Sequence, residues 1–103
     1  MRKAKIYNFG KFAGELIEFE KGKSYKFIYD KKYDGTPISL TMPVEKKEFL
    51  FDRFPPFFEG LLPEGMQLEA LVRQTKTDKS DFFSIIVITG KDLVGSVTVE
   101  EES

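Results

Sequence analysis

At 103 residues, with 41% hydrophobic and 32% charged side chains, the chain has the size and composition of one soluble globular domain, which we take to span residues 1–103. A net charge of −1 gives no general attraction for a phosphate backbone or an anionic bilayer, so direct binding to nucleic acid or to a membrane is not expected. Cysteine and histidine are both absent, which excludes disulfides, thiol nucleophiles and the commonest metal ligand.

The start of the chain predicts a β-hairpin. Residues 4–9 form the first strand, and a turn at Gly10–Lys11 leads into the second strand, residues 12–20. In the second strand Ile17 and Phe19 alternate with glutamates, so we expect these two side chains on the buried face of the hairpin. The basic side chains near the start alternate with apolar residues and are expected on the wet face of the first strand: Arg2, Lys3 and Lys5.

A third strand and an extended segment follow. Tyr25, Phe27 and Tyr29 fall on one face of the third strand, which completes a meander of three antiparallel strands. Residues 36–43 are bounded by prolines, which suits an edge strand or an ordered loop that lies against the sheet.

The middle of the chain changes to the spacing of helices. Apolar residues recur at intervals of three and four on both sides of Pro63: Phe54, Phe57, Phe58, Leu61, Leu62, Leu68, Leu71 and Val72. Pro63 has no backbone N–H and pushes Leu62 out of helical geometry, so one helix ends near Leu62 and another begins just after it. We call residues 63–67 the corner. The break forces the corner towards the surface, where loops held by a rigid scaffold often carry function.

The last third of the chain predicts a helix and a closing strand. Asp78 and Ser80 are both suitable N-caps for this helix, and Gly90 supplies its C-terminal stop. The inward stripe of the helix carries Phe82, Ile85 and Ile86. The β-branched residues in 85–88 leave a strand open as the alternative. Residues 93–99 close the sheet, and an acidic, solvated tail ends the chain. Together the elements predict an α+β fold, a small antiparallel sheet with short helices packed on one side.

The residues offer no catalytic chemistry. The glycines stand singly at turns, without the lysine and hydroxyl residue of a nucleotide-binding loop. Asp78 and Asp81 are close in sequence, but neither they nor Asp30 and Asp34 match a calcium loop, so helix caps and solvated turns explain them better. We therefore expect no enzyme, and no catalytic residue, metal ion or cofactor.

Core packing explains most of the eleven phenylalanines. Those at inward positions of predicted elements are Phe12, Phe19, Phe27, Phe57, Phe58 and Phe82. Phe49, Phe51, Phe54 and Phe83 are less easily placed. Several of these exposed together would form an apolar surface for a partner.

The sequence predicts a cytoplasmic location. No apolar run approaches the roughly 20 residues needed to cross a membrane. The basic residues at the start are not followed by the apolar core of a signal peptide. The absence of cysteine fits a reducing compartment.

Five sequence motifs follow one another in a specific order. They are the N-terminal strand with its glycine turn, Tyr33 before the Pro-x-Ser…Pro segment 37–43, the Phe-Phe-Glu-Gly-Leu-Leu-Pro-Glu-Gly run 57–65, the Asp-Phe-Phe triplet 81–83, and the Gly-x-Asp-x-x-Gly strand from 90 to 95. In this order and spacing they resemble the N-terminal subdomain of HipA-type toxin kinases over nearly the whole chain. The resemblance implies the fold of that subdomain.

The chain also departs from HipA-type kinases. Such a kinase continues into a large catalytic core with a nucleotide loop, a catalytic aspartate and metal ligands, whereas this chain stops at Ser103. It is therefore similar to HipS, the small member of tripartite HipBST toxin–antitoxin systems. The resemblance implies an antitoxin that binds and neutralises a separate HipT-like kinase toxin, while a HipB-like partner in a larger complex binds DNA.

Two other functions remain open at this point. The chain can be a non-catalytic subunit that completes a split kinase and raises its autophosphorylation. It can also be an adaptor that bridges the kinase to a DNA-binding repressor without changing kinase activity.

The corner is the expected contact with the kinase. Its residues are Pro63, Glu64, Gly65, Met66 and Gln67. Met66 would be an adaptable apolar anchor, and Glu64 would be the charged partner of a kinase lysine or arginine. The alternative is that Glu64 caps the following helix and Met66 packs under it. A second candidate contact consists of Phe82 and Phe83.

Overall fold

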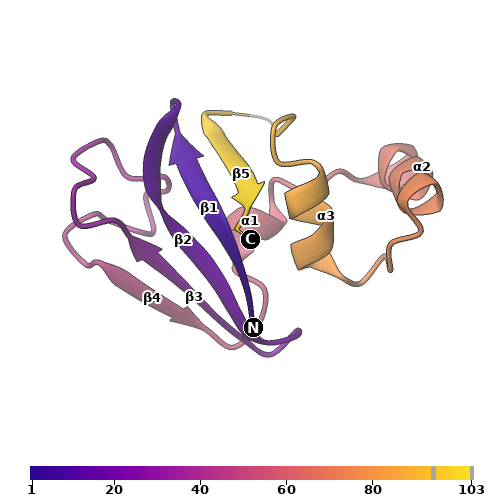
Figure 1. The fold of residues 1–103 in the computed structure, drawn as a ribbon, viewed down its shortest axis with the longest axis horizontal. Coiled ribbons are helices and arrows are strands. Elements are labelled where there is room, and N and C mark those ends of the chain that lie inside the picture. Colours follow the sequence, from indigo (N-terminus) through magenta and orange to yellow (C-terminus); the bar gives the residue numbers. More distant parts are fainter. Residues whose placement is uncertain (94, 103) are drawn as a thin grey trace.

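The computed structural model describes residues 1–93 and 95–102. Within them, three short helices lie on one side of a five-stranded antiparallel sheet (Figure 1). The elements along the chain are β1 (Arg2–Asn8), β2 (Lys11–Glu20), β3 (Ser24–Tyr29), β4 (Glu48–Phe51), α1 (Pro56–Glu59), α2 (Gly65–Thr75), α3 (Phe82–Ile88) and β5 (Val97–Glu101). The expected α+β fold is confirmed. Val94, which the sequence placed in the last strand, and Ser103 lie outside the described residues.

The strands lie in the order β4-β3-β2-β1-β5. β1, β2 and β3 form the predicted meander, in which each strand is antiparallel to the next. β5 pairs with β1 and closes the sheet at one edge as expected, but it spans Val97–Glu101 rather than residues 93–99. Glu100 and Glu101, which were expected in a solvated tail, therefore belong to the strand, because they pair with Lys5 and Ala4 of β1. β4 pairs with β3 at the other edge and was not predicted, because four residues are too few to show a clear alternation.

The prediction that Ile17 and Phe19 face the core is wrong. Glu18 faces the helices and is only 4% exposed, whereas Phe19 is 48% exposed. Ile17 is buried, but it belongs to the opposite face of the sheet, where its cross-strand neighbours are Lys3 and Lys26. The aliphatic stems of two lysines can shield an isoleucine there while their ammonium groups stay in water.

Hydrogen bonds explain why Glu18, rather than Ile17 or Phe19, lies on the core face of β2. Arg2 Nε donates to Glu18 Oε1 over 2.6 Å, and the Tyr25 hydroxyl donates to Glu18 Oε2 over 2.8 Å. A buried carboxylate is tolerated when both its oxygens are bonded. The placement of Arg2 on the wet face is therefore wrong as well, while Lys3 and Lys5 do lie on the face opposite to Arg2, half-buried.

One hydrophobic core joins the sheet to the helices and loops. Its buried members are Ala4, Ile6, Ala13, Leu16, Tyr25, Phe27, Tyr29, Tyr33, Ile38, Met42, Phe49, Phe54, Phe58, Phe83, Ile86, Val97 and Val99. The three aromatic residues of β3 all belong to it, as predicted. Residues 36–43 form an ordered loop against the sheet, because the Tyr29 hydroxyl accepts from the Ile38 N–H (3.0 Å) and donates to the Met42 carbonyl (2.5 Å).

The phenylalanines do not form the exposed patch that was considered. Phe49, Phe54 and Phe83 are buried and Phe51 is half-buried. Phe12 and Phe19 were expected inside but are exposed instead. Phe12 faces away from the core beside a β-bulge in β2, and its ring packs edge-on against Tyr7 at a centroid distance of 5.7 Å.

The helices flanking Pro63 are confirmed. α1 ends at Glu59, and α2 begins at Gly65. Between them, the backbone N–H groups of Leu61 and Leu62 donate to the carbonyls three residues earlier, which continues the turn to Leu62. No helix in the described part of the chain is long and apolar enough to span a membrane.

α3 is helical, so the strand alternative for 85–88 is not adopted. Its N-cap is Asp81 rather than Asp78 or Ser80, and the Asp81 carboxylate accepts from the Ser84 N–H over 3.2 Å. The buried side chains of α3 pack on the sheet, and this tertiary contact outweighs the β preference of branched residues.

Gly90 follows α3 as predicted, but its main role is close approach to β5. The Gly90 carbonyl accepts from the Val99 N–H over 2.9 Å. A Cβ at this position would lie 1.8 Å from the Val99 carbonyl oxygen. Only glycine allows the two backbones to meet here.

Candidate functional site

The corner is a sharp reversal between α1 and α2. Pro63 is half-buried, and Glu64 is extended with φ −131° and ψ 165°. Gly65 then starts α2 with a φ of +60°, a backbone conformation that favours glycine. The Pro-Glu-Gly sequence therefore specifies this reversal locally, as the sequence predicted.

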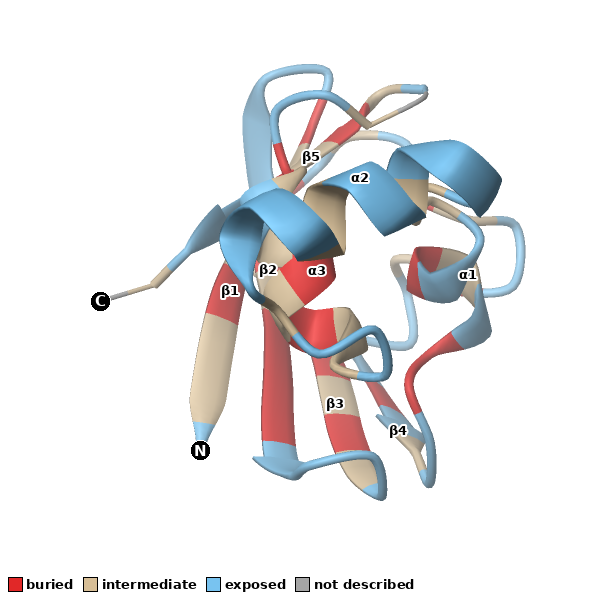
Figure 2. Ribbon diagram, turned by 90° about the vertical axis from the view of Figure 1, so that its right-hand side faces the viewer, coloured by how far each residue is buried: buried red, intermediate tan, exposed pale blue. Residues whose placement is uncertain are grey.

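α2 carries the corner away from the sheet. It lies at the end of the long axis opposite to β4 (Figure 1), and none of its side chains is buried (Figure 2). Leu68, Leu71 and Val72 form its half-buried stripe. A helix held by so little burial presents most of its surface to solvent.

Met66 and Glu64 are free at the surface of the corner. Met66, in the first turn of α2, is 88% exposed. Glu64 is exposed and makes no side-chain capping bond to α2. The structure therefore shows neither Met66 packed under the helix nor Glu64 as its side-chain cap. The corner thus presents a flexible apolar side chain and a carboxylate to solvent, next to each other.

An open groove of about 660 Å³ adjoins the corner. Its apolar lining comes from the α1–α2 turn, from α2 and from the segment after α3: Leu61, Leu62, Pro63, Leu71 and Leu93. Glu64 and Asp92 are exposed carboxylates on the same groove. This combination suits an apolar side chain of a protein partner that is followed by a basic group.

The second candidate, Phe82 and Phe83, does not join the corner. Phe83 is buried, and the ring of Phe82 packs edge-on against Phe54 at a centroid distance of 5.6 Å. Both residues lie at the start of α3, whereas Thr89, at its other end, lines the corner groove. These two rings mainly anchor α3 to the core.

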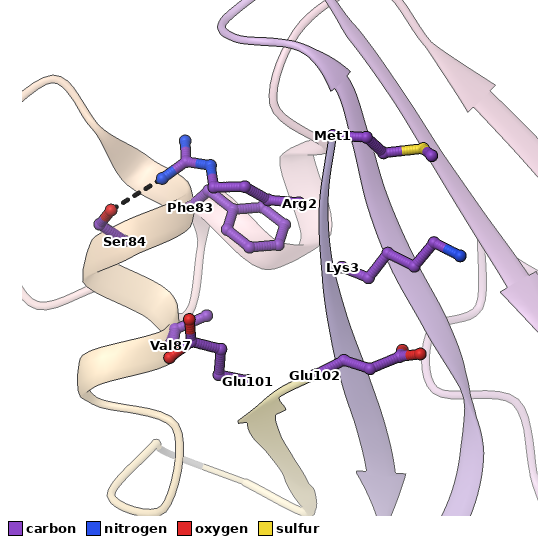
Figure 3. A pocket seen from close by; sticks show the side chains of 8 residues that line it. All are labelled: Met1, Arg2, Lys3, Phe83, Ser84, Val87, Glu101 and Glu102. Carbon is purple, nitrogen blue, oxygen red and sulfur yellow. Dashed lines mark hydrogen bonds between the residues drawn. The ribbon is translucent and has the colours of Figure 1, made fainter.

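Sequence reasoning missed a polar hub around Arg2. Its guanidinium donates to Glu18, to Asp81 (2.9 Å) and to the Ser84 hydroxyl (2.8 Å), and it lies 4.9 Å from the Phe83 ring centroid. The hub borders an open hollow between α3, the start of β1 and the end of β5 (Figure 3). The alternation of side chains along β1 could have revealed it, because Arg2 lies on the same face of the strand as the buried Ala4 and Ile6.

The hub shifts the pKa of two side chains. Burial alone would raise the pKa of Asp81, but hydrogen bonds from Arg2 and Ser84 outweigh it and hold that pKa well below its ordinary range. Burial and the hydrogen bond to Glu18 raise the pKa of Tyr25 to about 12. Because these bonds satisfy the polar groups of the hub, it is best explained as a structural device that fixes α3 to the sheet. Among the described residues, no three acidic side chains gather into a possible metal site.

The fold and the exposed corner define a small α+β domain that presents a helical surface outside its core. A family model described as the HipA N-terminal domain matches residues 4–100, so the chain belongs to the HipA N-terminal domain family. The family resemblance of the sequence motifs is thereby confirmed.

The chain is also similar to a solved structure and to a curated protein. A solved structure described as the N-terminal domain of HipA toxin matches with a TM-score of 0.78 and 29% identity, over 100% of this chain and 94% of that one. An uncharacterized protein of Haemophilus influenzae (strain Rd) is 33% identical over 102 residues, which cover 99% of this chain and 94% of that protein.

Proposed function

We propose that the protein is an antitoxin of the HipS type, which binds and neutralises a HipA- or HipT-like serine/threonine kinase toxin. Membership of the HipA N-terminal domain family supports a toxin–antitoxin context. The observation that carries the proposal is the corner: Met66 is 88% exposed on a helix without a buried side chain. The role is non-enzymatic, in the cytoplasm, and a HipB-like DNA-binding protein is a further partner.

The corner offers two kinds of contact to a kinase. Met66 is flexible and polarizable, so it can fill an irregular apolar pocket on the partner. Glu64 can pair with a lysine or arginine beside that pocket. The adjoining groove can receive an apolar side chain of the kinase in return, which would make the contact reciprocal.

A protein that binds through the corner can inhibit a kinase without catalysing any reaction itself. A kinase transfers phosphate only when its loops and lobes reach a closed arrangement. A bound protein that prefers the open arrangement shifts the equilibrium by its difference in affinity for the two states. A domain that places a helix against the open arrangement of the kinase is suited to this role.

The test is autophosphorylation of a HipA- or HipT-like kinase from the same source, with and without an excess of the purified protein. Wild type is expected to abolish the signal, and Met66→Asp is expected to lose at least about tenfold in affinity. Leu40→Asp is the matched control, since Leu40 is fully exposed in the loop before β4 and is expected to inhibit like wild type.

Each other result contradicts the antitoxin role in a defined way. Increased autophosphorylation would identify a subunit of a split kinase. Unchanged activity with altered affinity of the complex for DNA would identify an adaptor. No affinity for the kinase would refute all three functions.

A further inference from the structure

One edge of the sheet ends in a strand that is free to pair. β4 is the last strand in the order β4-β3-β2-β1-β5, and β3 is its neighbour on one side. Leu50, in the middle of β4, is 76% exposed. An edge strand leaves backbone N–H and C=O groups unpaired, and these are a template for another strand. The opposite edge is partly occupied, because the Val99 N–H of β5 already donates to the Gly90 carbonyl over 2.9 Å.

The backbone of β4 shows which groups are available. The Tyr29 N–H of β3 donates to the Lys47 carbonyl over 2.9 Å. In an antiparallel ladder, residues bonded to one neighbour alternate with residues whose N–H and C=O point to the other side. Lys47 and Phe49 therefore face β3, while Glu48 and Leu50 direct their backbone groups outwards.

We propose that a second copy of this chain pairs with this edge, β4 against β4, antiparallel about a two-fold axis at Phe49. In this register Glu48 of each copy lies opposite Leu50 of the other, so the outward backbone groups of both strands meet. A two-fold contact of this kind is closed and uses the same patch twice. The proposal does not rest on the antitoxin role.

Charges that flank β4 complement one another in this register. Continued beyond β4, the register brings Lys46 opposite Asp52 of the other copy and Glu45 opposite Arg53, in the turn and bends that flank the strand. All four side chains are exposed. None of them has an ion-pair partner within 4 Å among the described residues. Opposite charges directly across a sheet favour pairing.

Shifting the two-fold axis by one residue in either direction also lets the outward backbone groups of the two strands meet. Both of these registers, however, bring like charges together. An axis at Leu50 would place Glu48 opposite Asp52 and Lys47 opposite Arg53. An axis at Glu48 would place the two Glu48 side chains opposite each other. Like charges directly opposite destabilise a sheet, so the sequence around β4 selects the axis at Phe49.

The same pairing covers apolar surface on both faces of the sheet. The two Leu50 side chains become diagonal neighbours on the open face. On the helix side, the pairing brings the two copies together beside a hollow of about 320 Å³ lined largely by apolar groups, including Phe49, Met42 and Phe57. Because α2 lies at the end of the molecule opposite to β4 (Figure 1), the dimer leaves both corners free at its far ends.

Analytical ultracentrifugation of the full chain tests the dimer. Wild type is expected to dimerise with a Kd in the micromolar range, on the order of 1–500 µM for a contact of this size. Lys46→Asp and Asp52→Lys each place like charges opposite, and each is expected to raise Kd by about tenfold or more. The double variant restores both pairs and is expected to return Kd to the wild-type value.

Two results would overturn the dimer. One is a protein that stays monomeric at every concentration. Binding of an unrelated extended peptide to the edge would not rescue the proposal in that case. The other is a double variant as weak as the single variants. The substituted residues are exposed, and circular dichroism spectra identical to wild type establish that each variant is folded.

Cysteine cross-linking tests the register, since the chain has no cysteine of its own. Glu48→Cys and isotope-labelled Leu50→Cys are mixed and oxidised, and the mixed disulfide is expected to exceed either self-disulfide several-fold. Of the three disulfides that these two variants can form, only the one between positions 48 and 50 joins residues directly opposite each other, within disulfide reach. Glu100→Cys, exposed on β5, measures random collision. Mixed product at the level of that control would refute this register.

Discussion

Arg2 connects three parts of the fold through one side chain. It binds Glu18 on β2 and both Asp81 and Ser84 at the start of α3. Glu18 is almost fully buried, so its carboxylate depends on Arg2 and on the Tyr25 hydroxyl for hydrogen bonds. An unpaired carboxylate in such a place would be strongly destabilising.

Replacing Arg2 with methionine is therefore expected to destabilise the fold. The apolar packing of the side chain is kept, but Glu18 loses its charged partner. We expect Arg2→Met to lower the free energy of unfolding by about 2 kcal/mol, below the value for fully buried pairs because Arg2 is partly exposed to water. Urea unfolding measures this, with Lys5→Met on the opposite face of β1 as the control. A loss no greater than that of the control would contradict a structural role for the hub.

Asp81 makes the free energy of unfolding depend on pH in the acid range. Its pKa is lowered in the folded protein, so its contribution is complete above its ordinary pKa of about 3.9 and is lost as pH falls below that value towards the folded pKa. The difference in unfolding free energy between wild type and Asp81→Asn is expected to shrink by about 1 kcal/mol between pH 7 and pH 3. Urea unfolding at both pH values measures it. An equal difference at both would contradict the role of Asp81.

At the scale of the elements, local rules explain the break between α1 and α2 better than the edge strand β4. A proline separates α1 from α2, and a glycine with positive φ opens α2, so both features could be predicted from Pro63 and Gly65. β4 could not be predicted from its four residues, because it exists through pairing with β3.

The contact between α3 and β5 depends on the absence of a side chain at Gly90. A Cβ there would meet the Val99 carbonyl oxygen at 1.8 Å, and backbone atoms cannot move aside easily. Gly90→Ala is expected to lower the free energy of unfolding by about 2–4 kcal/mol. Gly60→Ala is the control, because its Cβ would lie 3.4 Å from the nearest atom, and it is expected to change stability by less than about 1 kcal/mol. Thermal unfolding of both variants would decide, and equal effects would contradict this reading of Gly90.

At the scale of the whole molecule, α2 stands apart from the single core. Every other helix contributes a buried side chain, and α2 contributes none. Elements with little burial open locally without unfolding the rest. The part of the fold proposed to bind a kinase is therefore also the part that is easiest to reshape on binding.

Hydrogen exchange measured by mass spectrometry tests this separation. Amides of α2 are expected to exchange about 100-fold faster than those of β2, which lies inside the sheet. Addition of the kinase is expected to slow exchange in α2 and leave β2 unchanged. Equal protection of α2 and β2 in the free protein would show that α2 is part of the cooperative core.

The sequence by itself determined the features that local chemistry controls. The meander, the break at Pro63, the exposed corner and the aromatic face of β3 all follow from turn residues and short periodic patterns. The face of β2 could not be predicted in this way, because Glu18 is buried only through Arg2 and Tyr25, which lie on other strands.

Tertiary structure alone decided which side chains are available for function. It buried Phe83 under Arg2, left Leu50 exposed and created β4 at the edge of the sheet. The physical reason is that burial and pairing depend on residues distant in the chain, whereas turns and caps depend on neighbours.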